Sequence, residues 1–104
     1  MSRLELEVIR HHHERWDGTG YPTGRAGKDI PIAARVVAIA DVYDALRSTR
    51  PYKQPWRHED AVAYIRDQAG KHFDPKLVEL FLSLSDEFND AFERMPDGEY
   101  GDIA

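Results

Sequence analysis

One segment limits the possible folds more than any other, because residues 31–47 are apolar on almost every side. A helix with that pattern is normally buried in the centre of a protein. Asp41 lies inside this segment, and a buried carboxylate without a partner strongly destabilises a fold. We therefore expect Asp41 to bind a metal ion, a histidine, or one of the arginines Arg35, Arg47 and Arg50.

The remaining apolar periodicity predicts three further helices, at residues 2–14, 58–69 and 75–93. Residues 15–30 contain glycine and proline too often for a helix, and they predict a loop long enough to be functional. We expect His72 and Phe73 to pack at a turn without a catalytic role. The predicted fold is therefore all-α, a helical bundle of about four helices with a long glycine-rich loop.

Three consecutive histidines, His11 to His13, end the first predicted helix and precede the glycine-rich loop. The apolar stripe of that helix, from Leu4 through Val8, continues into His12. We therefore expect the histidines where the buried face ends, at the rim of a pocket. Neutral histidine is the commonest metal ligand, and neighbouring helical side chains point about 100° apart. His12 and His13 thus suit two adjacent ions, or one ion at a frayed helix end. The alternative is a polar helix terminus on the surface.

The composition restricts the chemistry of such a site. The chain of 104 residues has no cysteine, so a metal ion must be held by imidazole and carboxylate groups, which suits zinc, iron, manganese or nickel. The net charge of −5 argues against binding to polymeric nucleic acid. Residues 1–56 carry nine Lys and Arg against seven Asp and Glu, whereas residues 57–104 carry five against twelve. A phosphate ligand is therefore expected in the first half.

Arg50 and Lys53 place two cations directly after the Asp41 helix, in a loop bracketed by prolines. A guanidinium can donate two parallel hydrogen bonds to phosphate oxygens, and an ammonium adds a point charge. This pair is the candidate phosphate-binding element, and ordinary solvated surface charges are the alternative.

The sequence shows no apolar run of about 18 residues that would span a membrane, and no secretory signal. We expect a cytoplasmic protein, and we expect residues 95–104 to form an acidic, flexible tail.

Several motifs together closely resemble the HD-GYP family, over roughly residues 5–84. The resemblance rests on His12-His13-Glu14, Asp17-Gly18-Thr19-Gly20-Tyr21-Pro22, Ala40-Asp41-Val42-Tyr43-Asp44-Ala45-Leu46, Arg50-Pro51-Tyr52-Lys53 and Gly70-Lys71-His72-Phe73-Asp74-Pro75. Members of this family are bacterial, cytoplasmic, metal-dependent phosphodiesterases with the all-α fold of the HD superfamily, and the resemblance suggests a place in two-component signalling. The combined signal is far more specific than one short motif.

The resemblance implies hydrolysis of cyclic di-GMP to the linear dinucleotide pGpG or to GMP. It also implies a centre of two or three divalent ions, commonly iron with manganese as a substitute. On the family pattern, the metal ligands are His12, His13 and Asp41, whereas His11 is additional. Arg50 and Lys53 match the pair that holds substrate phosphate, and with Asp41 they form the implied catalytic set. Gly20, Tyr21 and Pro22 match the signature loop, which shapes the substrate pocket and is implicated in contacts with diguanylate cyclase (GGDEF) domains.

The sequence departs from the family pattern upstream of the histidines, where the family has a His-Asp pair that this chain lacks. We therefore expect residues 1–94 to be the C-terminal part of an HD-GYP domain, incomplete without an upstream HD half or a second copy. The absent helices would also cover Val36, Val37 and Ile39, which we expect to be exposed. The alternatives are a catalytically inactive module that binds a diguanylate cyclase through the Gly-Tyr-Pro loop, and a truncated chain with no independent role.

Overall fold

The computed structural model describes residues 2–49 and 54–94, apart from the side chain of Glu7. In these ranges it has five α-helices and a 3₁₀ helix: α1 (Arg3–His11), the 3₁₀ helix (Gly27–Asp29), α2 (Ile32–Arg47), α3 (His58–Asp67), α4 (Pro75–Ser83) and α5 (Ser85–Arg94). The described residues form no β-strand, so the predicted all-α class is confirmed. No helix within them has the length and apolar character needed to cross a membrane. The predicted tail at 95–104 lies outside the described residues.

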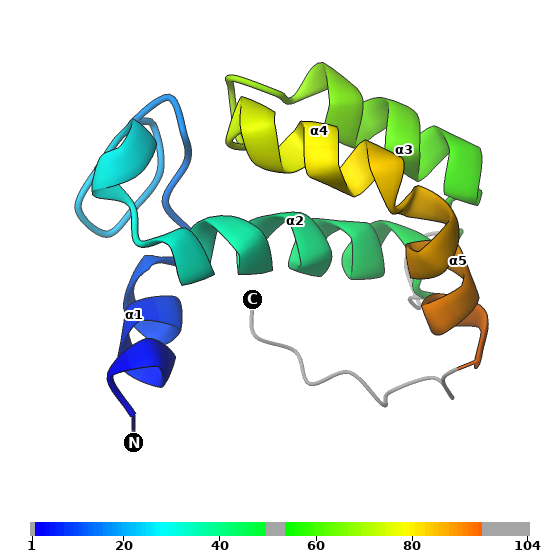
Figure 1. Ribbon diagram of the computed structural model, residues 1–104, viewed down its shortest axis with the longest axis horizontal. Helices are drawn as coiled ribbons and strands as arrows, with labels where there is room; N and C mark the ends of the chain where they lie inside the picture. Colours follow the sequence, from blue (N-terminus) through cyan, green and yellow to red (C-terminus); the bar gives the residue numbers. More distant parts are fainter. Residues whose placement is uncertain (1, 50–53, 95–104) are drawn as a thin grey trace.

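The helix α2 lies at the centre of the arrangement (Figure 1). Helices α3 and α4 lie side by side along one flank of α2, and α5 lies at its C-terminal end. Helix α1 and the loop that follows it lie at the opposite, N-terminal end of α2. Helix α1 ends at His11, and the turn that carries His12 and His13 is therefore placed near the N-terminal end of the central helix.

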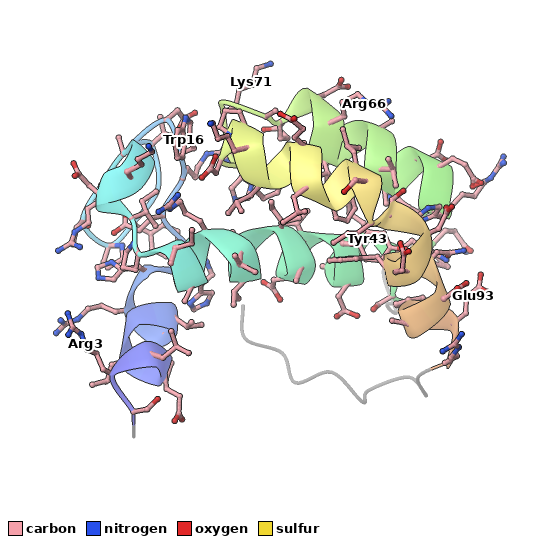
Figure 2. All side chains as sticks on the ribbon, viewed as in Figure 1. Arg3, Trp16, Tyr43, Arg66, Lys71 and Glu93 are labelled. Atoms are coloured by element: carbon pink, nitrogen blue, oxygen red, sulfur yellow. The ribbon has the colours of Figure 1, made fainter. Side chains whose placement is uncertain are left out.

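The core forms where α2, α3 and α4 meet. Tyr43 of α2 contacts the rings of Phe81 and Phe88 at centroid distances of 5.8 and 5.7 Å, and Figure 2 shows it on the side of α2 that faces α5. The buried residues of this core are Ala38, Ile39, Tyr43, Ala61, Ile65, Phe73, Val78 and Phe81. Apolar burial of this kind stabilises the fold, and it fixes the position of α2 and hence of the Asp41 backbone.

The single helix predicted over residues 75–93 is wrong, because the chain bends at Leu84 and forms α4 and α5. Leu84 has φ −111° and ψ 11°, and its N–H is shared between two carbonyls of the preceding turn. The hydroxyl of Ser83 donates to a backbone carbonyl at 2.7 Å, a local bond that competes with regular helix geometry. The bend turns Phe88 back toward Tyr43. The apolar spacing continues through the bend, so periodicity alone does not reveal it.

The apolar face of α1 is not buried in the way that the sequence predicts. Leu4, Leu6 and Ile9 are each more than half exposed, because α2 is the one helix with which α1 makes an extensive contact among the described residues. Val36 is 49% exposed, as expected, whereas the prediction for Ile39 is wrong. Ile39 is 4% exposed, since it points into the core shared with α3 and α4.

Asp74 caps α4 and connects it to α2. Its carboxylate accepts a hydrogen bond from the backbone N–H of Lys76 at 2.9 Å, and Pro75 follows it as the first helical residue. The Nη1 of Arg35 lies 2.6 Å from the other carboxylate oxygen, in an ion pair that is mostly buried. Such a pair is costly to break by removing one partner, so it holds the start of α4 against the first half of α2.

Candidate metal and phosphate site

The three predicted metal ligands, His12, His13 and Asp41, line one cavity with a volume of about 350 Å³. The turn directly after α1 supplies the imidazoles, α2 supplies the carboxylate, and the glycine-rich loop closes one side. The full lining consists of His12, His13, Arg15, Thr19, Gly20, Tyr21, Ala38, Asp41, Val42, Ala45 and His72. The fold therefore brings the predicted ligands to a common space, while their role as ligands stays a prediction.

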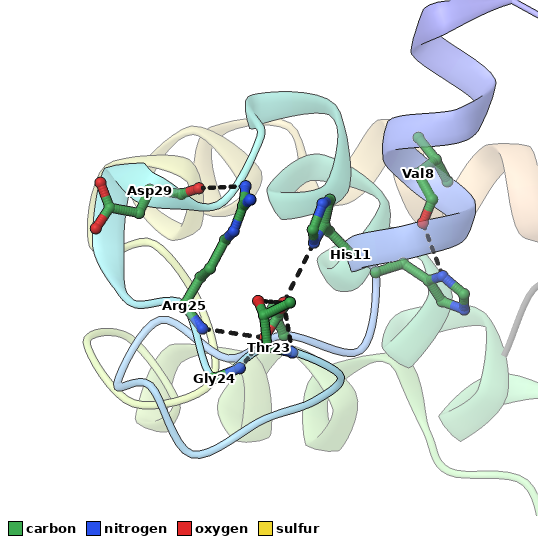
Figure 3. Close-up of polar contacts among 8 residues, drawn as sticks. Val8, His11, Thr23, Gly24, Arg25 and Asp29 are labelled. Carbon is green, nitrogen blue, oxygen red and sulfur yellow. Dashed lines mark hydrogen bonds and ion pairs between the residues drawn. The ribbon is translucent and has the colours of Figure 1, made fainter.

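His12 has the hydrogen-bonding pattern of a metal ligand. Its Nδ1 lies 2.8 Å from the carbonyl oxygen of Val8, a contact drawn in Figure 3. Because a carbonyl oxygen only accepts, Nδ1 must carry a proton, and in the neutral form of the ring Nε2 then has a free lone pair. This Nε2 is buried and has no hydrogen-bond partner among the described residues. A metal-ligating histidine characteristically donates its other ring N–H to a carbonyl or carboxylate, and the contact between Nδ1 of His12 and the Val8 carbonyl has this form.

His13 is held by the signature loop. Its ring stacks on Tyr21, with 4.7 Å between ring centroids and 17° between the planes, and the His12 ring lies 4.1 Å away. The backbone N–H of Tyr21 also donates to the carbonyl of His13 at 3.3 Å. Pro22 follows Tyr21 through a cis peptide bond and is exposed. Of the three signature residues predicted to bind substrate, Gly20 and Tyr21 line the cavity and Pro22 does not.

Asp41 is partly buried on α2 and contributes to the cavity wall. Two of its alternative arginine partners make their contacts elsewhere. Arg35 pairs with the cap of α4, and Arg47 donates to the Tyr43 hydroxyl. The third, Arg50, lies outside the described residues, as does Lys53, so the predicted phosphate-binding pair stays a prediction.

Glu14 is the residue around which the glycine-rich loop folds. Its carboxylate is buried, with the residue 2% exposed, and it accepts the backbone N–H groups of Thr23, Gly24 and Arg25 at 3.2, 2.9 and 3.2 Å. It also accepts the Thr23 hydroxyl, and Nδ1 of His11 lies 3.2 Å away. Figure 3 shows His11, Thr23 and Gly24 converging on this point.

These contacts decide the charge state of Glu14. Burial raises the pKa of Glu14, but the hydrogen bonds from Thr23, His11 and the loop backbone outweigh burial, so the pKa is lower than its ordinary value. The ionised carboxylate is therefore the form that organises the loop. His11, the additional histidine, serves this carboxylate and is absent from the cavity lining.

Gly20 allows the loop to cross the end of α1 at very short range. A Cβ added at Gly20 would lie 2.4 Å from the carbonyl oxygen of His13 and 2.6 Å from the backbone nitrogen of Arg15. Only glycine permits so close an approach of two backbone segments. This crossing is what brings Tyr21 onto His13.

Two residues that line the cavity, His72 and Arg15, have no role in the site predicted from the sequence. The turn that carries His72 docks beside the histidines, because Trp16 donates its N–H to the His72 carbonyl at 3.0 Å. Burial, and then the charge of Arg15, lower the pKa of His72 to about 4. His72 is therefore neutral at pH 7. The segment that contains His72 is one of the motifs that resemble the HD-GYP family. The spacing of residues along the chain does not indicate that this turn lies beside the cavity.

The donor types in the cavity fit a divalent ion. Neutral imidazole nitrogens and a carboxylate are suitable ligands, and the unpartnered Nε2 of His12 is the specific feature that a cation would satisfy. Within residues 2–49 and 54–94, however, no three His, Asp or Glu side chains lie close enough together to hold an ion by themselves. The described residues thus supply part of a ligand set.

The chain matches the family model for the HD domain over residues 6–77. It is 48% identical over 99 residues to a probable cyclic di-GMP phosphodiesterase of Vibrio cholerae. It is 50% identical over 97 residues to a protein of the same organism named 3'3'-cGAMP-specific phosphodiesterase 2, and 45% identical over 95 residues to a cyclic di-GMP phosphodiesterase of Thermotoga maritima. These matches cover 95%, 93% and 91% of this chain but only 22%, 19% and 26% of the relatives. The chain therefore spans about a fifth to a quarter of their length.

Proposed function

This chain belongs to the HD domain family, in its HD-GYP group, and from that premise we propose that it forms part of the active site of a metal-dependent phosphodiesterase. The proposed substrate is cyclic di-GMP, and the proposed product is pGpG or GMP. The observation that carries the proposal is that Nε2 of His12 is buried and has no partner among the described residues, while His12 itself lines the cavity together with His13 and Asp41. A buried nitrogen is costly to leave unpaired, and a bound divalent ion would supply its partner.

The HD domain family in general depends on divalent metal ions. We assign His12, His13 and Asp41 as ligands, with iron or manganese as the metal and two or three ions in the complete centre. When bound, a divalent ion supplies Lewis-acid chemistry, because it lowers the pKa of a coordinated water and polarises phosphoryl oxygens. The further ligands would come from a helical segment that carries the His-Asp pair of the family.

The other residues of the cavity would position the substrate. Tyr21 is 62% exposed, and its ring stacks on that of His13, so it can shape the substrate side of the pocket. Neutral His72 adds no positive charge that would repel a metal ion. Arg50 and Lys53 are proposed to hold phosphate oxygens and to neutralise charge that develops there.

Metal binding tests the central assignment. We expect His12→Ala to weaken Mn²⁺ binding about 100-fold, because second-sphere changes alone cost 10–100-fold and this change removes a donor. The measurement is calorimetric titration of the chain at pH 7, with and without an added helical fragment that carries the His-Asp pair. The matched control is His58→Gln, because His58 bonds to the Tyr43 hydroxyl at 2.9 Å and is absent from the cavity lining. Equal Mn²⁺ affinity for wild type and His12→Ala would contradict the assignment.

Hydrolysis of cyclic di-GMP distinguishes the proposed enzyme from a catalytically inactive binding module. We expect the chain to convert cyclic di-GMP to pGpG only when the His-Asp fragment is present, with 3'3'-cGAMP assayed in parallel. A catalytically inactive module predicts no turnover in either condition. It also predicts binding to a GGDEF domain that survives both His12→Ala and Asp41→Ala, whereas our proposal predicts that both substitutions abolish turnover.

A further inference from the structure

Arg15 is the one arginine or lysine in the described lining of the cavity. Its side chain is about one third exposed, at 34%, yet its Nε is buried and has no hydrogen-bond partner among the described residues. An unpaired buried donor is unfavourable, especially on a charged group. The Nε of Arg15 therefore lacks an acceptor, and Arg15 lines the cavity in which a ligand could lie.

The nearest carboxylate does not meet this need. Oδ1 of Asp17 lies 3.7 Å from Nε of Arg15, which is too long for a hydrogen bond. The same oxygen already accepts the backbone N–H of Thr19 at 3.0 Å and its hydroxyl at 2.6 Å. Asp17 therefore forms an ion pair with Arg15 but leaves its Nε without a hydrogen bond.

The backbone around Arg15 is fixed by its neighbours. The N–H of Trp16 donates to the His72 carbonyl at 3.0 Å, and the Arg15 carbonyl accepts the N–H of Gly18 at 2.9 Å. Gly20 packs directly against the Arg15 nitrogen. A side chain that starts from a fixed backbone loses less conformational freedom when it binds a ligand.

We propose that Arg15 binds a non-bridging phosphate oxygen of the cyclic dinucleotide, or of its linear product, inside the cavity. This inference rests on the proposed function and adds a residue to it. A guanidinium donates two parallel hydrogen bonds to a phosphate and keeps its charge at any pH of interest. Arg15 follows His12 and His13 along the chain and lines the same cavity as they do.

The test is binding of pGpG to the chain together with the His-Asp fragment, measured by calorimetry. We expect Arg15→Gln to weaken pGpG binding about tenfold, in line with the loss of a charge-assisted hydrogen bond. The pGpG affinity of Arg15→Lys should lie between the affinities of wild type and Arg15→Gln. An ammonium keeps the positive charge but cannot donate two parallel hydrogen bonds as a guanidinium does. The matched control is Arg25→Gln in the same loop, since Arg25 donates to the Asp29 carbonyl at 3.4 Å and does not line the cavity. It should bind pGpG as wild type does.

Asp17→Asn distinguishes this role from a purely structural one. If Arg15 only steadies the loop through Asp17, Asp17→Asn should weaken pGpG binding as much as Arg15→Gln does. Our inference predicts unchanged or tighter binding instead, because a competing negative charge is removed. Wild-type affinity in Arg15→Gln, or an equal loss in Asp17→Asn, overturns it.

Mn²⁺ titration of the same samples distinguishes failure of the Arg15 assignment from failure of the proposed function. Normal Mn²⁺ binding with no effect of Arg15→Gln removes the Arg15 assignment alone. Absence of both Mn²⁺ and pGpG binding in wild type removes the proposed function and this inference with it.

Discussion

Replacement of Gly20 by alanine is expected to lower the free energy of unfolding by about 4 kcal/mol, at the upper end of single-substitution effects. The added Cβ would lie 2.4, 2.6 and 2.8 Å from the His13 oxygen, the Arg15 nitrogen and the Glu14 carbonyl carbon. All three neighbours are backbone atoms, which cannot rotate away as a side chain can. Either the loop or the end of α1 must move. Thermal unfolding should show the melting temperature lowered by more than about 15 °C.

Gly24→Ala is the matched control for this prediction. A Cβ at Gly24 meets only the Gly18 carbonyl oxygen, at an ordinary 3.5 Å, although its φ of +70° favours glycine. The expected loss is about 1 kcal/mol, from backbone conformation alone. Equal destabilisation by Gly20→Ala and Gly24→Ala would show that the close backbone crossing at Gly20 is not the reason why glycine is required there.

The central position of α2, and the presence of Asp41 on the same cavity as two histidines, agree with expectations from local patterns. A helix that is apolar on most sides has to be central, and one carboxylate inside it has to meet a partner. The stripe through Val8 and His12 then directs the histidines toward the same helix. These steps need only helical periodicity and the cost of burying charge, and the structure brings His12, His13 and Asp41 to one cavity.

Other parts of the site depend on contacts between segments that are distant along the chain. His72 and Trp16 are joined by a backbone hydrogen bond, and a sequence pattern does not encode which carbonyl an N–H will choose. The bend at Leu84 is set by a shared backbone N–H, while the apolar spacing runs on unchanged. The exposure of Leu4 and Ile9 reflects what packs on α1, and periodicity identifies an apolar face without identifying what covers it.

Replacement of Glu14 by glutamine is expected to cost about 3 kcal/mol at pH 7, because hydrogen bonds to a charged acceptor are worth roughly 1.5–3 kcal/mol and an amide NH₂ would face donors. Three backbone N–H groups, from Thr23, Gly24 and Arg25, converge on this carboxylate together with His11. A glutamine amide accepts through one oxygen only, so at least one buried donor loses its partner. Chemical denaturation of wild type and variant measures the difference. Glu79→Gln, at an exposed position of α4, should change stability by less than about 0.5 kcal/mol.

The stability difference between wild type and Glu14→Gln should depend on pH if the negative charge of Glu14 is what stabilises the loop. The folded pKa of Glu14 lies below its ordinary value of 4.5, so unfolding takes up a proton once the pH approaches that value. The stability contributed by the ionised carboxylate is therefore fully present above about pH 4.5 and is lost as the pH falls through the folded pKa. Glutamine does not titrate, and the other carboxylates titrate in both proteins. The difference in unfolding free energy between wild type and Glu14→Gln should consequently be largest at pH 7 and decrease progressively in more acidic solution. A gap that stays constant from pH 7 to pH 3 would mean that the shape of the side chain, and not its charge, holds the loop over the cavity.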